Sequence, residues 1–389
     1  METKKQKIIR ITTVPNSLTG LLRGQLRFMN QHYEVIGISS GGKGLEKVHT
    51  QEEIKVIPVE MTRKITPIKD IKAVIQLYRI FKNEKPFIVH SHTPKAGTVA
   101  MLAAKLAGVR FRLHTIAGLP LVEAKGLKRV LLNTVEKITY GCASMIYPNS
   151  QGLKDIILNN GFTSEKKLKI IGEGSSNGIN TSHFDPALFN EEDKAKLKGS
   201  LGINENHIVF TFVGRLVKDK GINELIEAFQ RISGTYDNVK LLLVGKYEKL
   251  LDPLLPETEK HIDTNPNILS VGWQTDVRPY FAITDALVFP SYREGFPNVV
   301  MQAGAMKVYS IVTNINGCNE IIVEGENGTI IETKSAKALY DKMKLFCENA
   351  LIYDADKCRQ LIVSRYEQHY IWSEILKVYQ TLENSVKRS

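Results

Sequence analysis

Short apolar runs recur along the whole chain, and segments with a helical hydrophobic period separate them. Within residues 222–229, for example, apolar side chains recur at intervals of three and four, at Ile222, Leu225, Ile226 and Phe229. Strands that alternate with helices at this spacing favour parallel, doubly wound sheets of the α/β class. The expected strands are Lys7–Thr13, Tyr33–Ile38, Ile54–Val59, Phe87–His90, Arg110–Thr115, Met145–Pro148, Leu168–Gly172, Ile208–Val213, Lys240–Val244, Ile268–Val271, Ala286–Pro290, Ser310–Thr313 and Thr329–Ile331.

The length of 389 residues suits two domains better than one core. Residues 172–185 are rich in glycine and small polar residues, which marks a domain boundary. We therefore predict a Rossmann-like first domain over residues 1–185 and a Rossmann-like second domain over residues 186–365. Residues 366–389 are expected to form a C-terminal helix that returns to the first domain.

The composition places the chain inside the cell. It is 43% hydrophobic and 24% charged, which are globular values. The four cysteines are scattered and show neither metal spacing nor a disulfide framework. The N-terminal region lacks the apolar core of a signal peptide, and no run approaches the roughly 20 apolar residues of a membrane span. We expect a cytoplasmic protein.

The excess of positive over negative charge lies entirely in the first half of the chain. Residues 1–185 hold 28 Lys+Arg and 14 Asp+Glu, a balance of +14, whereas the remainder holds 24 and 27, a balance of −3. Basic residues also flank apolar stripes in two stretches, with Lys69, Lys72, Lys82 and Lys85 in one and Lys125, Lys128 and Arg129 in the other. One reading is a solvated basic surface; the other is contact with the anionic inner face of the cell membrane, which would make the protein peripheral.

Two motifs carry the candidate chemistry. After the expected strand Ile208–Val213 come Gly214, the cations Arg215 and Lys220, and a helix start at Gly221. Fixed cations between a strand and a helix start suit a diphosphate. The run Ser-Tyr-Arg-Glu-Gly-Phe-Pro-Asn then places Glu294 between another strand and another helix. A diphosphate site facing a carboxylate and loop amides fits a nucleotide-sugar.

These motifs resemble those of the retaining glycosyltransferases of family 4, which have the GT-B fold of two facing Rossmann-like domains. The resemblance covers nearly the whole chain and also rests on His90-Ser91-His92-Thr93-Pro94-Lys95-Ala96-Gly97 and on Gly174-Ser175-Ser176-Asn177-Gly178-Ile179-Asn180. These two runs are similar to the branch that acts on lipid-linked sugars in bacterial capsule and glycan assembly.

The resemblance implies a set of donor-site residues. Arg215 and Lys220 would bind the donor diphosphate, and Glu294 would lie beside the donor sugar. In the family a second glutamate, which binds the ribose, follows eight positions after the first; here that position is Gln302, which keeps an acceptor oxygen but loses the charge. The remaining expected donor-binding residues are Gly20, Gly214, Val244, Gly245, Gly272, Trp273, Gly295, Phe296, Pro297 and Asn298.

The histidines depart from the family pattern. The family places its histidine two residues after a threonine, but here Ala117 occupies that position and His114 precedes Thr115. Either His114 reaches the donor by another route or the site works without a histidine. Of the other two candidates, His92 lies nearer the loop than His90 and is the better candidate for the acceptor site.

The resulting hypothesis is a glycosyltransferase. It would move a hexose or N-acetylhexosamine from a UDP-sugar, with retention, to a sugar carried on a polyprenyl diphosphate. No metal or other cofactor is expected because the cations already compensate the diphosphate, and no nucleic acid is expected as a partner. Two alternatives stay open: a UDP-N-acetylhexosamine epimerase of the same architecture, and a non-catalytic partner protein with this fold.

Overall fold

The computed structural model describes residues 5–62, 66–119, 121, 124–248 and 252–387. The chain divides into two compact units. Unit 1 comprises residues 1–178 and 368–389, and unit 2 comprises residues 179–367. Both units hold one six-stranded sheet, and all of the strand pairs are parallel.

The sheet of unit 1 has the strand order β3-β2-β1-β4-β5-β6. Its strands are β1 (Lys7–Ile11), β2 (Glu34–Ser39), β3 (Lys55–Pro58), β4 (Ile88–Ser91), β5 (Phe111–Ile116) and β6 (Met145–Pro148). Its helices are α1 (Pro15–Leu21), α2 (Gln25–Asn30), α3 (Lys43–Glu52), α4 (Pro67–Glu84), α5 (Pro94–Leu106), α6 (Gly126–Cys142), α7 (Gln151–Asn159) and α16 (Gln368–Lys387).

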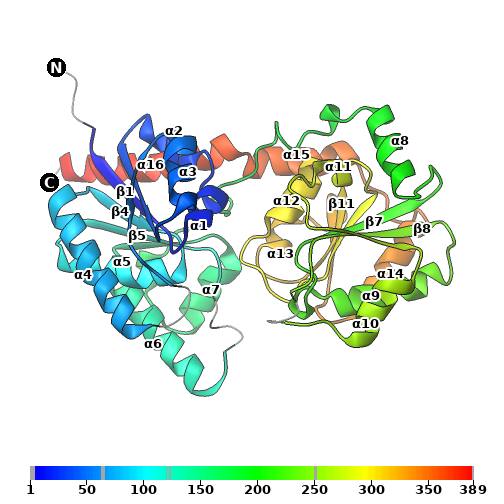
Figure 1. Cartoon of the computed structure of the whole chain (residues 1–389), viewed down its shortest axis with the longest axis horizontal. Coiled ribbons are helices and arrows are strands. Elements are labelled where there is room, and N and C mark those ends of the chain that lie inside the picture. The colour runs from blue at the N-terminus through cyan, green and yellow to red at the C-terminus, as the bar shows by residue number, and fades with distance from the viewer. Residues whose placement is uncertain (1–4, 63–65, 120, 122–123, 249–251, 388–389) are drawn as a thin grey trace. The chain divides into compact units, whose positions relative to one another are not determined.

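Alternate side chains of each strand face opposite layers of helices, as the parallel sheet requires. In β1, Ile9 and Ile11 join a core with α4, α5, α6 and α7, whereas Ile8 joins one with α1, α2, α3 and α16. Figure 1 shows α4, α5 and α6 on one side of this sheet and α2, α3 and α16 on the other. The C-terminal helix therefore packs on the first unit, as predicted.

The sheet of unit 2 has the order β12-β11-β10-β7-β8-β9. Its strands are β7 (Ile208–Val213), β8 (Val239–Val244), β9 (Ile268–Gly272), β10 (Ala286–Phe289), β11 (Tyr309–Thr313) and β12 (Gly328–Ile331). Its helices are α8 (Glu191–Ser200), α9 (Ile222–Ser233), α10 (Pro256–Thr264), α11 (Arg278–Phe281), α12 (Asn298–Ala305), α13 (Cys318–Ile321), α14 (Ala336–Cys347) and α15 (Ala355–Tyr366).

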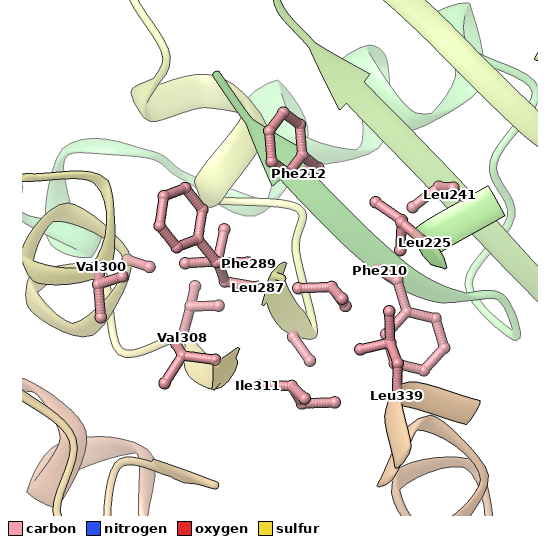
Figure 2. Close-up of a cluster of buried hydrophobic side chains, with 14 of the residues drawn as sticks. Phe210, Phe212, Leu225, Leu241, Leu287, Phe289, Val300, Val308, Ile311 and Leu339 are labelled. Atoms are coloured by element: carbon pink, nitrogen blue, oxygen red, sulfur yellow. The ribbon is translucent and has the colours of Figure 1, made fainter. Parts of the chain in front are cut away.

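Aromatic residues of β7 and β10 fill the core of unit 2. Phe212 and Phe289 stack with their ring centroids 6.0 Å apart. In Figure 2 these rings and Phe210 lie among aliphatic side chains from the strands and from α9, α12 and α14. The period that predicted α9 is confirmed, since Ile222, Leu225, Ile226 and Phe229 are all buried.

Three expectations need correction. The run Leu168–Gly172 is not a strand, because only Leu168 bridges to β6 and the chain turns at Gly172, where φ is 57°. The unit boundary follows Gly178 rather than Asp185. The last helix starts at Gln368, after an extended residue Glu367 (φ −57°, ψ 139°) that pairs with Ile179. The chain therefore enters unit 2 at Ile179 and leaves it at Glu367, and these two residues pair with each other.

Candidate functional site

The order of strands reverses at the centre of each sheet, between β1 and β4 in unit 1 and between β7 and β10 in unit 2. In open α/β sheets the loops after such neighbouring strands diverge to opposite faces and leave a crevice at their carboxyl ends, which is where ligands bind. The two predicted motifs of unit 2 follow β7 and β10, so the fold brings them to this crevice.

The loops of unit 2 approach each other so closely that two positions require glycine. A Cβ atom on Gly245, after β8, would lie 1.7 Å from the carbonyl oxygen of Gly214, after β7. Gly221 has φ +72°, and a Cβ there would lie 2.1 Å from the carbonyl oxygen of Pro290. Hydrogen bonds continue the contact, since Gly214 N–H donates to the Val244 carbonyl and Gly245 N–H donates to that of Gly272 at 2.8 Å. The predicted donor-binding residues Gly214, Val244, Gly245 and Gly272 therefore lie next to one another.

The central ion pair of this crevice joins Lys220 and Glu294, which are 74 residues apart in sequence. Their side chains are only 14% and 20% exposed. Ser291 Oγ also donates to Glu294 Oε1 at 3.3 Å, and Lys220 Nζ lies 6.0 Å from the centroid of the Phe289 ring. The cation and the carboxylate that the sequence assigned to the donor diphosphate and the donor sugar are thus in direct contact.

Two further ion pairs border this one. Arg215 bonds to Glu248 and keeps half of its side chain exposed. Arg293 Nη2 lies 2.8 Å from Asp219 Oδ2. The sequence analysis missed Arg293, although it stands beside Glu294 in the same motif. A cation next to the motif carboxylate is the signal that could have found it.

The loop after Glu294 leads into α12, which begins at Asn298 and has no acidic residue in its first turn. Phe296 in this loop is buried, and its ring centroid lies 5.3 Å from that of Tyr366. Phe296, which was expected to bind the donor, therefore also packs in the core of unit 2 against Tyr366. Gln302 lies half-buried on α12, and its side chain makes no hydrogen bond within the described part of the chain.

Two other residues complete the picture of this end of the sheet. Trp273 follows β9 and is 66% exposed. Cys318 begins α13 and is wholly buried; burial, with the nearby Glu294 carboxylate adding to it, raises the pKa of its thiol well above the ordinary value. The sequence analysis did not place this thiol near Glu294, because the two residues are 24 positions apart and follow different strands.

In unit 1 the predicted residues fall in different places. His92 follows β4 at the carboxyl end of the sheet, where its backbone N–H donates to the backbone carbonyl of Ile11 in β1 at 3.0 Å. His114 lies within β5, where Nδ1 bonds to Ser91 Oγ at 2.8 Å and the ring fills the space above Gly97 of α5. Burial lowers the pKa of His114 to about 4, so the ring is neutral. Its environment is that of a packing residue.

Gly20 is not in a loop. It lies in the last turn of α1, which begins at Pro15, and beyond the helix's own backbone and the adjacent residues no described atom lies within 4 Å of the position that a Cβ there would take. Proline suits the first helical position because its missing N–H would have no partner there. Gly20, which the resemblance implied as a donor-binding residue, is therefore a helical residue in this structure.

A buried polar network in unit 1 was also missed. The guanidinium of Arg10, in β1, donates to His92 Nε2 at 2.8 Å, to the Tyr379 hydroxyl at 2.9 Å and to Gln25 Oε1. The same hydroxyl lies 2.6 Å from His90 Nδ1. An arginine inside an apolar strand was the available signal, since a charged side chain there needs buried partners.

Comparison with known proteins gives concordant matches. Residues 193–367 match the family model "Glycosyl transferases group 1", and residues 21–150 match "Glycosyl transferase 4-like". The capsular polysaccharide biosynthesis glycosyltransferase CapM of Staphylococcus aureus is 35% identical over 97% of this chain and 98% of its own length. The UDP-Gal:alpha-D-GlcNAc-diphosphoundecaprenol alpha-1,3-galactosyltransferase of Escherichia coli is 28% identical over 79% of this chain and 78% of its own.

Solved structures support the fold. The Anabaena protein HepE, crystallised with UDP, superposes with a TM-score of 0.79 over 97% of this chain and 100% of its own, at 17% identity. At this level of identity the likeness concerns the architecture. Two Rossmann-like units, each with a parallel sheet, are the GT-B fold.

Proposed function

This chain belongs to the group 1 glycosyl transferases, and on that premise we propose that it takes its sugar, a hexose or an N-acetylhexosamine, from a UDP-sugar. The configuration at the transferred carbon is retained, and the acceptor is a sugar carried on a polyprenyl diphosphate. The names of the relatives support the donor and the acceptor: one uses UDP-Gal and a diphosphoundecaprenol acceptor, and another builds a capsular polysaccharide.

The contact between Lys220 and Glu294 carries the proposal. Negative charge grows on the leaving diphosphate as the glycosidic bond breaks, and a cation fixed beside it stabilises the transition state more than the ground state. An arriving diphosphate takes over Lys220 from Glu294, which frees the carboxylate to accept hydrogen bonds from the sugar. Arg215 and Arg293, each about half exposed, are placed to add charge from the rim.

This arrangement accounts for the reaction without a protein nucleophile. In the proposed mechanism the acceptor hydroxyl enters on the face that the diphosphate leaves, so the anomeric configuration is kept. The cationic side chains do the work that a divalent cation performs elsewhere, and we propose that the protein needs no metal. Turnover that is unaffected by a chelator is the expected result, and turnover that stops and returns with added Mg²⁺ would contradict it.

The transfer assay tests the function directly. The full chain is incubated with labelled UDP-hexoses and UDP-N-acetylhexosamines, with and without a bacterial lipid extract. We expect label in the lipid fraction only when the extract is present. An epimerised UDP-sugar would instead identify an epimerase, and neither product with any donor would favour a non-catalytic partner protein.

Two exposed apolar stripes support a membrane location. On α4, Ala73, Leu77 and Phe81 are buried against the unit, whereas Ile68, Ile71 and Ile75 are 74%, 61% and 47% exposed. On α6, Leu127, Val130, Leu131 and Ile138 are exposed as well. The sequence analysis left open a solvated basic surface or contact with the membrane; in the structure, apolar side chains on both helices are exposed as well. No helix in the described ranges is long and apolar enough to cross a bilayer.

We propose that unit 1 rests on an anionic membrane through α4 and α6. Basic residues near the surface contribute roughly 1 kcal/mol each, and the attraction fades over about a Debye length, near 10 Å at 0.1 M salt. Replacing Lys69, Lys72, Lys82 and Lys85 by glutamine is expected to weaken binding to anionic vesicles strongly, and Ile71→Ser with Ile75→Ser to weaken it further.

The control replaces Lys194, Lys196, Lys198 and Lys260 of unit 2, which should change vesicle binding little. Wild-type protein that ignores anionic vesicles at low salt would rule out the membrane location and favour a soluble acceptor.

A further inference from the structure

Arg10 is a fully buried cation without a carboxylate partner in the described part of the chain. Its three hydrogen bonds go to neutral groups, on His92, Tyr379 and Gln25. An ion that is removed from water without a counter-ion costs several kcal/mol. Burial accordingly lowers the pKa of Arg10, although guanidinium stays protonated at neutral pH. Unit 1 therefore holds an uncompensated positive charge beside His92.

Arg10 also fixes the proton of His92. Its Nε–H donates to His92 Nε2, so this ring nitrogen must be the acceptor and, in the neutral ring, the proton must sit on Nδ1. Burial, with the neighbouring His90 and Arg10 adding to it, lowers the pKa of His92 well below its ordinary value. The ring is thus a neutral donor at Nδ1, and it has no free nitrogen with which to act as a base.

The Nδ1–H donor of His92 has no partner among the residues that the structure describes. The side chain is buried, 4% exposed, and Nδ1 makes no hydrogen bond to any described residue. Buried donors without a partner are rare in folded proteins, and each one calls for an explanation such as a ligand. This donor is therefore available to an oxygen atom of a ligand.

His92 stands where a ligand binds. It follows β4 next to β1, at the switch point of the unit 1 sheet, and α5 begins two residues later at Pro94. This 13-residue helix has no acidic residue in its first turn and no side-chain cap. Pro94 has no N–H and the Gly97 N–H donates to the Thr93 carbonyl, so the backbone N–H groups of Lys95 and Ala96 stay without a partner in the helix, at the positive end of its dipole. Lys95 in that turn is paired with Asp70 of α4.

We propose that the β1/β4 switch point of unit 1 binds an anionic oxygen of the sugar acceptor, with the Nδ1–H of His92 as the direct donor. Arg10 is a positioning residue: it holds the ring in this tautomer and supplies the counter-charge. The bound group is a phosphate or a carboxylate, since a neutral sugar hydroxyl gains little from a buried guanidinium. A lipid-linked diphosphate provides the first and an acidic sugar the second. This inference rests on the proposed function, which supplies the acceptor.

The test measures anion binding independently of turnover. Full-length protein is first saturated with UDP to fill the donor site of unit 2. It is then titrated in a calorimeter with inorganic diphosphate and, separately, with glucuronate. We expect wild-type protein to bind at least one of the two anions. The anion that binds more tightly identifies phosphate or carboxylate as the acceptor chemistry.

The variants assign that binding to His92. His92→Phe and Arg10→Met should weaken it by about 10- to 100-fold, the effect of losing a hydrogen bond to a charged group. His92→Gln restores an N–H donor without a titrating ring and should recover most of the affinity. The control is Arg112→Met, because Arg112 lies in the same sheet near the start of β5 and donates only to backbone carbonyls.

Several outcomes would overturn the proposal: no anion bound by wild-type protein, unchanged binding in His92→Phe, or an equal loss in Arg112→Met. If Arg10→Met fails to fold, the comparison of His92→Phe with His92→Gln decides. Absence of sugar transfer counts against the proposed function only, since the diphosphate titration does not depend on it. If UDP does not bind, the proposed function fails, and the comparison of His92→Phe with wild-type protein still shows whether diphosphate binds at His92.

Discussion

The two switch points have the same topology and opposite chemistry. At β7/β10 in unit 2 the charged groups form ion pairs that keep between about a seventh and a half of each side chain exposed. At β1/β4 in unit 1 the polar groups are mainly histidines, threonines and Arg10, and most of them are buried; Lys95, in the first turn of α5, pairs with Asp70. Strand order therefore fixes where a ligand can bind, while the residues that follow the strands decide what it is.

The two sites differ in burial, and this decides how each can respond to a ligand. The ion pairs at β7/β10 can change partners when a ligand binds, whereas the buried hydrogen bonds at β1/β4 stay in place. The ion pairs of Arg215 and Arg293 are about half exposed on the arginine side and contribute little net stability. Lys220 and Glu294 are largely buried, so Lys220 needs a partner, and a diphosphate that replaces Glu294 supplies one. A buried network that loses one member leaves the others without partners, and that is expensive. Changes in unit 2 should therefore alter catalysis more than stability, and changes in the unit 1 network should do the reverse.

Lys220→Ala is the largest expected effect. It removes the least exposed cation of the donor site, and one such contact is typically worth about 2.7–4 kcal/mol, or roughly 100- to 1,000-fold in turnover. The melting temperature is measured as well, because the change also leaves the largely buried Glu294 without its cation and so lowers stability. Transfer rates are compared with those of Lys218→Ala, an exposed lysine in the same turn. Equal turnover in the two variants would remove Lys220 from the diphosphate site.

Tyr379→Phe tests the buried network from its α16 side. The change deletes one hydroxyl, yet it leaves both an Arg10 nitrogen and His90 Nδ1 without a partner. We expect a loss of about 1–3 kcal/mol in the free energy of unfolding of unit 1. Urea unfolding is followed beside Tyr78→Phe, a partly exposed tyrosine of α4. A loss no larger than that control would mean that the network does not hold α16.

Acid should weaken unit 1 before unit 2. The pKa of His114 is about 4 in the folded chain and about 6.5 in the unfolded chain, so between these values only the unfolded chain binds the proton. Stability therefore falls as the pH drops below 6.5, and His114 alone removes about 2 kcal/mol at pH 5. Burial lowers the pKa of His90 and His92 too, which acts in the same direction.

Amide-exchange protection factors measure this difference. Those of β4 and β5 should decrease between pH 7 and pH 5 while those of β10 and β11 hold, because every described histidine of unit 2 is at least partly exposed. Earlier loss of protection in β10 and β11 would show that carboxylates of unit 2, and not the histidines, govern acid stability.

Gln302→Glu is the smallest expected effect. It restores the charged acceptor that the family resemblance assigns to the ribose, so UDP should bind equally or more tightly, by about 1 kcal/mol at most. Calorimetry with UDP checks this against Gln230→Glu on α9. Much weaker binding in Gln302→Glu alone would show that the glutamine amide donates a hydrogen bond to the nucleotide.

Local patterns were enough to predict most of the fold. Apolar runs of strand length predicted all twelve strands that the described residues form, because strands buried on both faces are apolar along most of their length. The run Leu168–Gly172 was the exception, since its composition suits a strand but the chain turns before it can pair. The motif at Gly214–Gly221 could also be predicted from the sequence, because its turn glycines and its cations lie within eight consecutive residues.

Polar contacts between residues that are distant in sequence could be identified only from the tertiary structure. Nothing along the chain shows that Lys220 contacts Glu294, that Cys318 lies beside them, or that Arg10 bonds to Tyr379, 369 residues away. Hydrophobic period and turn chemistry are local properties, so the sequence by itself determined the elements and the family. The polar contacts depend on which strand ends become neighbours, and only the folded sheets bring those ends together.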